Sequence, residues 1–467
     1  MSWPATPLEF DRDEEHFLID EVSDEVLEAA AYDMVRPRPK DEPDETVARP
    51  RHGPWRRARS SREAAMLFEP ERHEALSSDR WDEQFVRAAI NQIVADTIRD
   101  FSATTLWPTH PDDAPPGATF YNLYSGAAGV IWALDCLRRS GAKDTIPDYG
   151  PIVVDLIAPN RARNACYQSP GMYLGVGGLL SGDTGIFLTA ARLNGIPTVV
   201  EQISEAIDGN ADNPCREFMY GATGTAVASL VMWRKTGDAI WADRFRRDIG
   251  RLWSQLRPCV DTDCLIWEQE IAGQLASYLG AVHGFAGNLL PAIQGWSLLS
   301  TEEQRDWSAC IERTLRATAI REGKLANWPL SQGRHRPGRT AILVQHCHGA
   351  PGIVNALAYF ADSRIDDLLI AAGELTWHAG PLVKGSGLCH GTAGNGFAFL
   401  KLFRRTKDEI WLDRARRFAM HACRQSHAAR QQRHQSNYSL WTGDLGLAIY
   451  LWHCVNLDDR FPTQDFF

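Results

Sequence analysis

The feature that most constrains the fold of this chain is a Gly-x-x-Gly step that recurs along most of its length. Each step is followed by an apolar stretch with helical spacing, and no comparable run of alternating strand pattern appears. Repeated units of this kind stack because one unit cannot bury its own apolar face. Seven such steps lie at Gly126–Gly129, Gly182–Gly185, Gly221–Gly224, Gly284–Gly287, Gly349–Gly352, Gly391–Gly394 and Gly443–Gly446.

The repeat predicts an all-α protein made of helical hairpins. The segment Thr236–Arg244 resembles Thr406–Arg414, and after the first of them Trp241, Phe245 and Leu252 fall on one helical stripe. Each unit is therefore expected to hold an inner helix after the glycine turn and then an outer helix. We expect seven hairpins closed into a ring, an α/α toroid, with an open solenoid as the alternative.

The domain boundary is expected near residue 66. Residues 1–65 form an N-terminal extension, with an acidic segment followed by an Arg- and Pro-rich linker that is typical of disorder. Residues 66–467 form the toroid. Its first helical stripe should begin after Trp81, where apolar or small residues recur every four positions, at Phe85, Ala89, Ile93, Thr97 and Phe101.

Composition narrows the possible partners and compartments. The net charge of −10, without a basic block, argues against nucleic acid as a partner. The N-terminus lacks the basic and apolar regions of a secretory signal, and no stretch is long and apolar enough to span a membrane. The ten cysteines are therefore expected to be reduced thiols in a cytoplasmic protein.

Two thiols and an imidazole occupy equivalent points of the repeat. Cys347 and Cys389 each stand two residues before a repeat glycine, and His283 stands one residue before another. Thiolates and imidazoles are ligands that suit zinc, so Cys347, Cys389 and His390 would make a Cys₂His site with one coordination position left open. The other interpretation is that the two cysteines are buried small apolar residues. His346 and His348 are rival ligands.

The segments around these residues resemble the signature motifs of lanthionine synthetase C, or LanC-like, proteins. They read Val282-His-Gly-Phe-Ala-Gly287, Gln345-His-Cys-His-Gly-Ala-Pro-Gly352 and Gly387-Leu-Cys-His-Gly391, and the resemblance extends from about Tyr121 to the end. It implies an α/α toroid whose central zinc is held by Cys347, Cys389 and His390. It also implies addition of a thiol to a dehydroamino acid, with His283 as the acid/base residue.

The resemblance favours the branch of this family that joins glutathione to dehydroalanine or dehydrobutyrine residues of peptides and proteins. Lys384 and Arg424 match that branch and would bind the glutathione carboxylates. Glu217 also matches it and is taken as a second catalytic candidate, whereas the cyclases of the family tend to have Asp there. An Arg that cyclases often carry is replaced by Leu343, and residues 425–437 look like an insertion.

Other functions stay open at this point. The first alternative is a cyclase that closes thioether rings within one peptide. The second is a non-catalytic scaffold that contains zinc, although a scaffold needs no open zinc position. A glycosidase-type toroid would need a pair of inward carboxylates, and none stands at the repeat turns.

Overall fold

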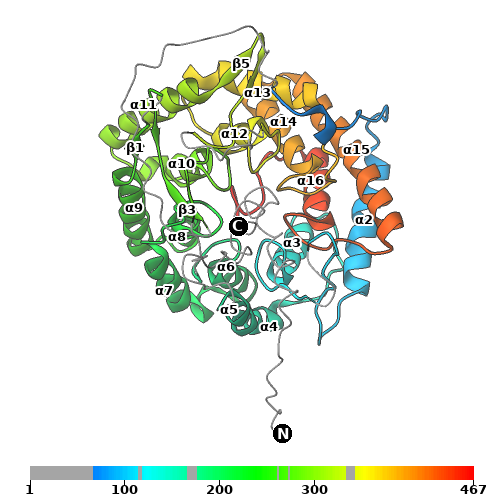
Figure 1. The fold of residues 1–467 in the computed structure, drawn as a ribbon. Helices are drawn as coiled ribbons and strands as arrows, with labels where there is room; N and C mark the ends of the chain where they lie inside the picture. Colours follow the sequence, from blue (N-terminus) through cyan, green and yellow to red (C-terminus); the bar gives the residue numbers. More distant parts are fainter. Residues whose placement is uncertain (1–66, 114–117, 166–175, 260–261, 272–273, 333–341) are drawn as a thin grey trace, which may run out of the picture. The chain divides into compact units, whose positions relative to one another are not determined.

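The computed structural model describes residues 67–467 apart from 114–117, 166–175, 260–261, 272–273 and 333–341. The described residues belong to one compact unit, Leu67–Phe467. The predicted N-terminal extension, residues 1–65, lies outside them. Within the unit, helices form an inner and an outer ring around a common centre (Figure 1). The protein is an all-α toroid.

Every one of the seven glycine turns starts an inner helix, as predicted. The first glycine of each step is the residue immediately before the helix, in an extended conformation or, at Gly349, with a φ of 106°. The inner helices are α3 (Ala127–Arg139), α6 (Asp183–Asn194), α8 (Ala222–Thr236), α10 (Phe285–Gln294), α12 (Ala350–Leu357), α14 (Thr392–Thr406) and α16 (Asp444–Asn456).

Outer helices follow the inner ones along the chain. They are α4 (Gly150–Val153) with α5 (Ile157–Ala165), α7 (Val200–Asn210), α9 (Ala239–Ser254), α11 (Thr301–Thr318), α13 (Asp366–Ala379) and α15 (Glu409–Arg433). The last inner helix, α16, packs instead against α2 (Glu83–Arg99), which precedes all the repeats. The outer position of the seventh unit is thus filled from the other end of the described chain.

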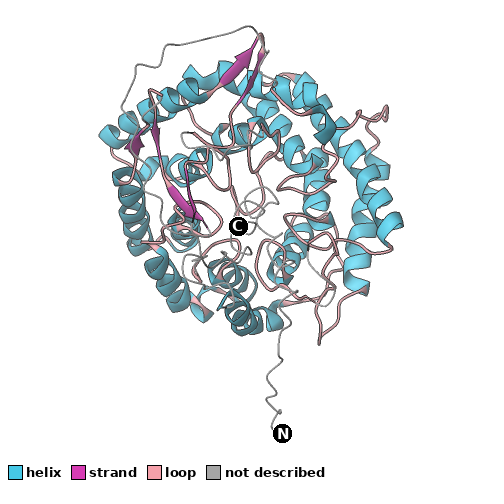
Figure 2. Ribbon diagram, in the orientation of Figure 1, coloured by secondary structure: helices cyan, strands magenta, loops and turns pink. Residues whose placement is uncertain are grey.

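Short non-α elements connect the helices (Figure 2). Three antiparallel hairpins pair β1 (Arg257–Pro258) with β2 (Leu265–Ile266), β3 (Gln269–Ile271) with β4 (Gln274–Ala276), and β5 (Ile320–Glu322) with β6 (Leu325–Asn327). Five short 3₁₀ turns are η2 (Pro70–Arg72), η3 (Val154–Leu156), η4 (Ile196–Thr198), η5 (Trp296–Leu298) and η6 (Ser363–Ile365). The hairpins were not expected from the sequence, because two- and three-residue strands are too short to show an alternating pattern.

The second glycine of each step is required by close packing. A Cβ atom at these positions would lie 1.8–2.5 Å from the carbonyl oxygen six residues earlier, in all seven units. Such a distance is far inside van der Waals contact, so each inner helix can rest on the loop that precedes it only where the side chain is a hydrogen atom. The repeated glycine is therefore a packing requirement of the fold.

Main-chain hydrogen bonds between consecutive turns close the ring. In every link an N–H donates to the carbonyl of the residue two positions before the repeat glycine of the next turn. The final link returns from the N–H of Trp441 to the carbonyl of Tyr124 in the first turn, at 3.1 Å. The accepting carbonyls belong to Leu180, Met219, Val282, Cys347, Cys389, Trp441 and Tyr124. An open solenoid has no such last link, so the toroid was the correct prediction.

The C-terminal segment runs into the middle of the ring (Figure 1). The Phe461 ring stacks on His346 at 4.1 Å between centroids, and the side-chain amide of Gln464 donates to the carbonyl of Ala281 in the fourth turn. The buried ammonium of Lys401, on α14, pairs with Asp465. These contacts tie the chain end to several repeats at once.

The predicted stripe on the first helix was only partly correct, since Ile93 and Thr97 are buried but Phe85 is not. On α2, Phe85 is 48% exposed and Ala89 is half-buried, whereas Val86 and Ile90 face the core. A four-residue step advances 400° around a helix of 3.6 residues per turn, so the predicted stripe drifts off the buried face. Within the predicted insertion, residues 425–433 continue α15.

No helix in the described ranges combines the length and apolar character needed to cross a membrane. The nine cysteines among the described residues carry no disulfide, as expected for reduced thiols. Cys166 lies outside the described residues.

The packing role of the second glycine predicts a stability difference between two glycines. Gly224→Ala should lower the free energy of unfolding by about 1–3 kcal/mol, because the new Cβ would lie 2.3 Å from the Phe218 carbonyl oxygen and 2.7 Å from Leu179 Cβ. Gly250→Ala, on the exposed side of α9 with nothing within 4 Å, should raise it by about 0.5–1 kcal/mol. Urea denaturation of both variants checks this, and equal effects would contradict it.

Candidate functional site

A candidate metal site lies where the fifth and sixth turns meet. Ligand atoms of Cys347, Cys389 and His390 lie within 4.8 Å of one another. The two cysteines stand at the position that accepts the inter-turn hydrogen bond, and the Cys347 N–H donates to the Cys389 carbonyl at 3.0 Å. Equivalent positions in adjacent turns project their side chains to the same place, which is why residues 42 positions apart in the sequence converge.

The donor set fits a thiophilic metal ion such as zinc. Cys347 and Cys389 are buried, whereas His390 is partly exposed. The hydrogen bond from Cys347, aided by His390, holds the pKa of the Cys389 thiol well below its ordinary value. The Nδ1 atom of His390 is buried and has no hydrogen-bond partner among the described residues. Two thiols, one of them readily ionised, and one imidazole are ligands that zinc prefers.

The structure does not bring the two rival histidines into this cluster. His346 is stacked on Phe461, and its Nδ1 lies 3.0 Å from the side-chain amide of Asn355. His348 stacks on His283 with 5.9 Å between ring centroids, and both of its ring nitrogens are buried without a hydrogen-bond partner in the described chain. Burial lowers the pKa of both imidazoles, that of His346 to about 3.

His283 and Glu217 form a buried pair in neighbouring turns. Nδ1 of His283 lies 2.9 Å from Oε2 of Glu217. The same carboxylate accepts hydrogen bonds from the backbone N–H groups of Met219, Tyr220 and Gly221. A carboxylate with this many donors is held in place and can fix the orientation and tautomer of an imidazole. Because Glu217 contacts Nδ1, Nε2 is the ring nitrogen with which His283 would contact any other group.

The ligand sulfurs also face side chains outside the cluster. The amide nitrogen of Gln345 donates to Cys347 Sγ at 3.0 Å, and the Tyr124 hydroxyl lies within hydrogen-bonding reach of Cys389 Sγ. Burial raises the pKa of Tyr124 well above its ordinary value, which keeps the hydroxyl protonated. Tyr124 holds the same position in the first turn that the two cysteines hold in theirs, two residues before the glycine.

The two predicted cationic residues are placed differently. Lys384 is exposed, and its charge contributes to lowering the pKa of His348, so its ammonium lies in the electrostatic range of the site. Arg424 lies on outer helix α15, where its exposed guanidinium pairs with Asp79. Among the described residues, Arg424 therefore contacts Asp79 and not the three candidate metal ligands.

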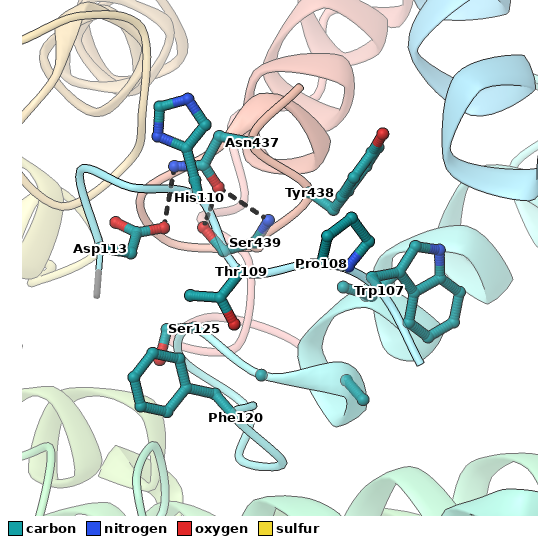
Figure 3. A pocket seen from close by; sticks show the side chains of 13 residues that line it. Trp107, Pro108, Thr109, His110, Asp113, Phe120, Ser125, Asn437, Tyr438 and Ser439 are labelled. Carbon is teal, nitrogen blue, oxygen red and sulfur yellow. Dashed lines mark hydrogen bonds between the residues drawn. The ribbon is translucent and has the colours of Figure 1, made fainter. Parts of the chain in front are cut away.

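A pocket lies beside the seam between the first and last turns (Figure 3). Trp107, Phe120, Asn437 and Ser439 are among the residues that line about 320 Å³ of space, which includes open solvent. Asp113, one of the pocket residues, accepts hydrogen bonds from Asn437 and Thr442, and burial raises the pKa of its carboxyl. None of the three candidate metal ligands lines this pocket.

The comparison with protein families decides the identity of the fold and site. Residues 76–465 match the profile described as "Lanthionine synthetase C-like protein". The chain belongs to the lanthionine synthetase C-like family. This match covers the whole of the repeat array, from the segment before α2 to the C-terminal tail, so the family resemblance of the sequence motifs is confirmed for the chain as a unit.

Individual LanC-like relatives match parts of the chain. The LanC-like protein GCL1 of Arabidopsis thaliana is 35% identical over 198 residues, which cover 40% of this chain and 43% of that protein. Glutathione S-transferase LANCL1 of Danio rerio is 29% identical over 255 residues, covering 50% and 58% respectively. The chain thus spans about half the length of these relatives. A solved structure of nisin cyclase aligns at 16% identity with a TM-score of 0.48, covering 82% of this chain and 99% of that one.

No role was predicted from the sequence for Gln345 and Tyr124, two residues beside the ligand sulfurs of this LanC-like site. Gln345 stands inside a recognised motif, but a glutamine two residues before a cysteine carries no chemical signal by itself. Tyr124 could have been found by aligning the seven turns on their glycines, since it shares the position of Cys347 and Cys389. Its contact with a sulfur in the sixth turn follows from ring closure, which the sequence does not show.

The Glu217–His283 pair predicts a defined tautomer. In the wild type the proton of the neutral His283 ring should lie on Nδ1, because a carboxylate can only accept. In Glu217→Gln an amide oxygen in the place of Oε1 still accepts the N–H groups of Tyr220 and Gly221, so the NH₂ group replaces Oε2, faces Nδ1 and should move the ring proton to Nε2. Nitrogen-15 NMR of histidine-labelled protein at alkaline pH measures this, with His283→Asn identifying the signal. The same tautomer in both proteins would contradict the assignment.

Proposed function

We propose that this LanC-like protein adds a thiol, with glutathione as the preferred donor, to dehydroalanine or dehydrobutyrine residues of peptides or proteins. The observation that carries this proposal is the convergence of a Cys₂His cluster and a buried His–Glu pair in four consecutive turns of one ring. The Ala281 N–H of the His283 turn donates to the Cys347 carbonyl, so the two groups belong to adjacent turns. The product is a thioether.

The residues Cys347, Cys389 and His390 would hold the zinc ion. Zinc with three protein ligands keeps a fourth position for a substrate thiol and lowers the pKa of that thiol from about 8.5 toward neutrality. This matters because a free thiol is mostly protonated at neutral pH, and the thiolate is the nucleophile.

His283 would supply the proton that completes the addition. As the S–Cβ bond forms, the electron pair of the Cα=Cβ bond moves to Cα and its carbonyl, giving an enolate that needs a proton at Cα. An imidazole held in one orientation by a buried carboxylate can act as the general acid for this step. Glu217 itself would orient His283 rather than touch the substrate.

Glutathione as the donor is supported by the position of Lys384. Lys384 is exposed and stands five residues before Cys389 in the chain, and its charge, after burial, contributes to lowering the pKa of His348 beside Cys347. Glutathione has two carboxylates flanking its thiol, and an ammonium can pair with one of them. Arg424 is the second proposed contact, although it would have to leave Asp79 to make it. The name of the relative LANCL1 agrees with this choice of thiol.

The metal assignment predicts about one equivalent of zinc per chain. Cys389→Ala should reduce the zinc content to near zero because it removes a ligand atom from the cluster. Cys454→Ala, which changes a buried cysteine on α16 outside the cluster, should leave the zinc content unchanged. Metal analysis of the purified proteins by mass spectrometry measures both. Zinc retained by the Cys389 variant would refute this ligand set.

The thiol donor is tested with a dehydroalanine peptide that contains no cysteine. Zinc-loaded wild type should form the glutathione thioether, and Lys384→Ala should raise the KM for glutathione about tenfold to a hundredfold, which corresponds to one charge-assisted hydrogen bond of about 1.5–3 kcal/mol. Arg424→Ala should raise it less, since that guanidinium is already paired. Initial rates by mass spectrometry give both constants.

A small uncharged thiol is the control for this experiment, because neither variant should change its KM. If wild type ignores glutathione but closes a thioether ring within a peptide that contains both dehydroalanine and cysteine, the cyclase alternative is correct. Zinc binding without either reaction would favour the scaffold alternative.

A further inference from the structure

Both ligand sulfurs of the metal cluster have a side-chain hydrogen-bond donor that the proposed reaction does not use. Gln345 is buried, and its amide nitrogen lies 3.0 Å from Cys347 Sγ. Tyr124, in the first turn, stacks on Trp441, whose carbonyl accepts the N–H of Cys389 in the sixth turn. Hydrogen bonding from the Tyr124 hydroxyl contributes, after that from Cys347, to the lowered pKa of the Cys389 thiol. Two donors from different turns therefore meet two sulfurs in one site.

In thiol addition a ligand sulfur could attack the electrophile in place of the substrate sulfur, and such donors can prevent this side reaction. During the proposed reaction, three sulfurs are close to one electrophilic Cβ atom: those of Cys347, Cys389 and the substrate. If a ligand sulfur attacked, an S–Cβ bond to the protein would form, Cα would take up a proton, and the ligand would be lost. The nucleophilicity of a thiolate falls as its negative charge is drawn away, and a hydrogen-bond donor draws charge away.

We propose that Gln345 and Tyr124 protect the ligand sulfurs of Cys347 and Cys389 from alkylation, so that the substrate thiol alone reacts. They are positioning residues that act through the metal ligands and need not touch the substrate. The inference rests on the proposed function in one respect, which is that zinc occupies the cluster.

The surroundings hold both donors in place before any substrate arrives. The Tyr124 ring is 4% exposed and stacks on Trp441, with 5.7 Å between centroids and 23° between planes. Its carbonyl accepts the N–H of the same Trp441, and the Trp441 carbonyl accepts the N–H of Cys389. Gln345 is fixed by a backbone hydrogen bond from its N–H to the His348 carbonyl at 3.0 Å. Rigid donors of this kind tune a metal ligand at little entropic cost.

The experiment compares alkylation of zinc-loaded wild type, Gln345→Met and Tyr124→Phe. Each protein is treated with iodoacetamide and, separately, with a dehydroalanine peptide without any free thiol, and modified cysteines are located by peptide mass spectrometry. We expect Gln345→Met to be modified faster at Cys347 and Tyr124→Phe faster at Cys389, each about twofold to tenfold, as for the loss of one hydrogen bond.

Two further measurements separate protection from a general loss of structure. Tyr450→Phe removes a buried hydroxyl that donates to the Ala415 carbonyl at 2.6 Å rather than to a ligand sulfur, and should change neither rate. In cobalt-substituted protein, the sulfur-to-metal charge-transfer band should move to lower energy in Gln345→Met and Tyr124→Phe, because the sulfurs become more electron-rich. It should stay in place in Tyr450→Phe.

Several results would overturn the proposal. The proposal is wrong if Cys347 and Cys389 are alkylated at the wild-type rate in both variants. It is also wrong if both variants speed up alkylation of the same cysteine. A variant that loses its zinc before alkylation would show that its side chain holds the metal, which refutes protection by that residue. If the wild-type protein binds no zinc, both this proposal and the proposed function are wrong. If it binds zinc and its ligand sulfurs are protected but no thioether forms, only the proposed function is wrong.

Discussion

The closed circuit of main-chain hydrogen bonds is the constraint on which the rest of this structure depends. In each turn the carbonyl two residues before the repeat glycine accepts from the preceding turn, and the link from Trp441 to Tyr124 completes the circle. Because the register is the same at every link, side chains at equivalent positions of adjacent turns converge. Cys347 and Cys389 become neighbours for this reason, and Tyr124 reaches Cys389 because the circle closes.

Closure in turn depends on contacts between distant parts of the chain. Helix α2 takes the outer place beside α16, and the C-terminal tail joins His346, Ala281 and Lys401 from inside the ring. The second glycine of each step lets an inner helix rest on the loop before it. A substitution that separates the first and last turns would therefore disturb the candidate metal cluster, even if it alters none of the three ligands.

The chemistry of the site is anchored to this framework. Glu217 is held by three backbone N–H groups and in turn holds His283, so the proposed acid/base pair is oriented by the main chain. The sulfurs, by contrast, have side-chain donors in Gln345 and Tyr124. The proposed acid/base pair is thus held by main-chain donors, whereas the proposed metal ligands have side-chain donors.

The sequence alone determined the repeat, the helical class, the glycine at every inner-helix start and the three residues of the candidate metal site. These were readable because each depends on local spacing: a glycine is required where a Cβ would meet a carbonyl oxygen, and cysteines at equivalent repeat positions converge in any stacked array. Only the tertiary structure decided closure of the ring, the use of α2 as the seventh outer helix, the place of Arg424 beside Asp79, the separation of His346 and His348 from the ligands, and the contact of Tyr124 with Cys389. Each of these depends on which distant segments meet, and pairings across hundreds of residues leave no periodic pattern in a single sequence.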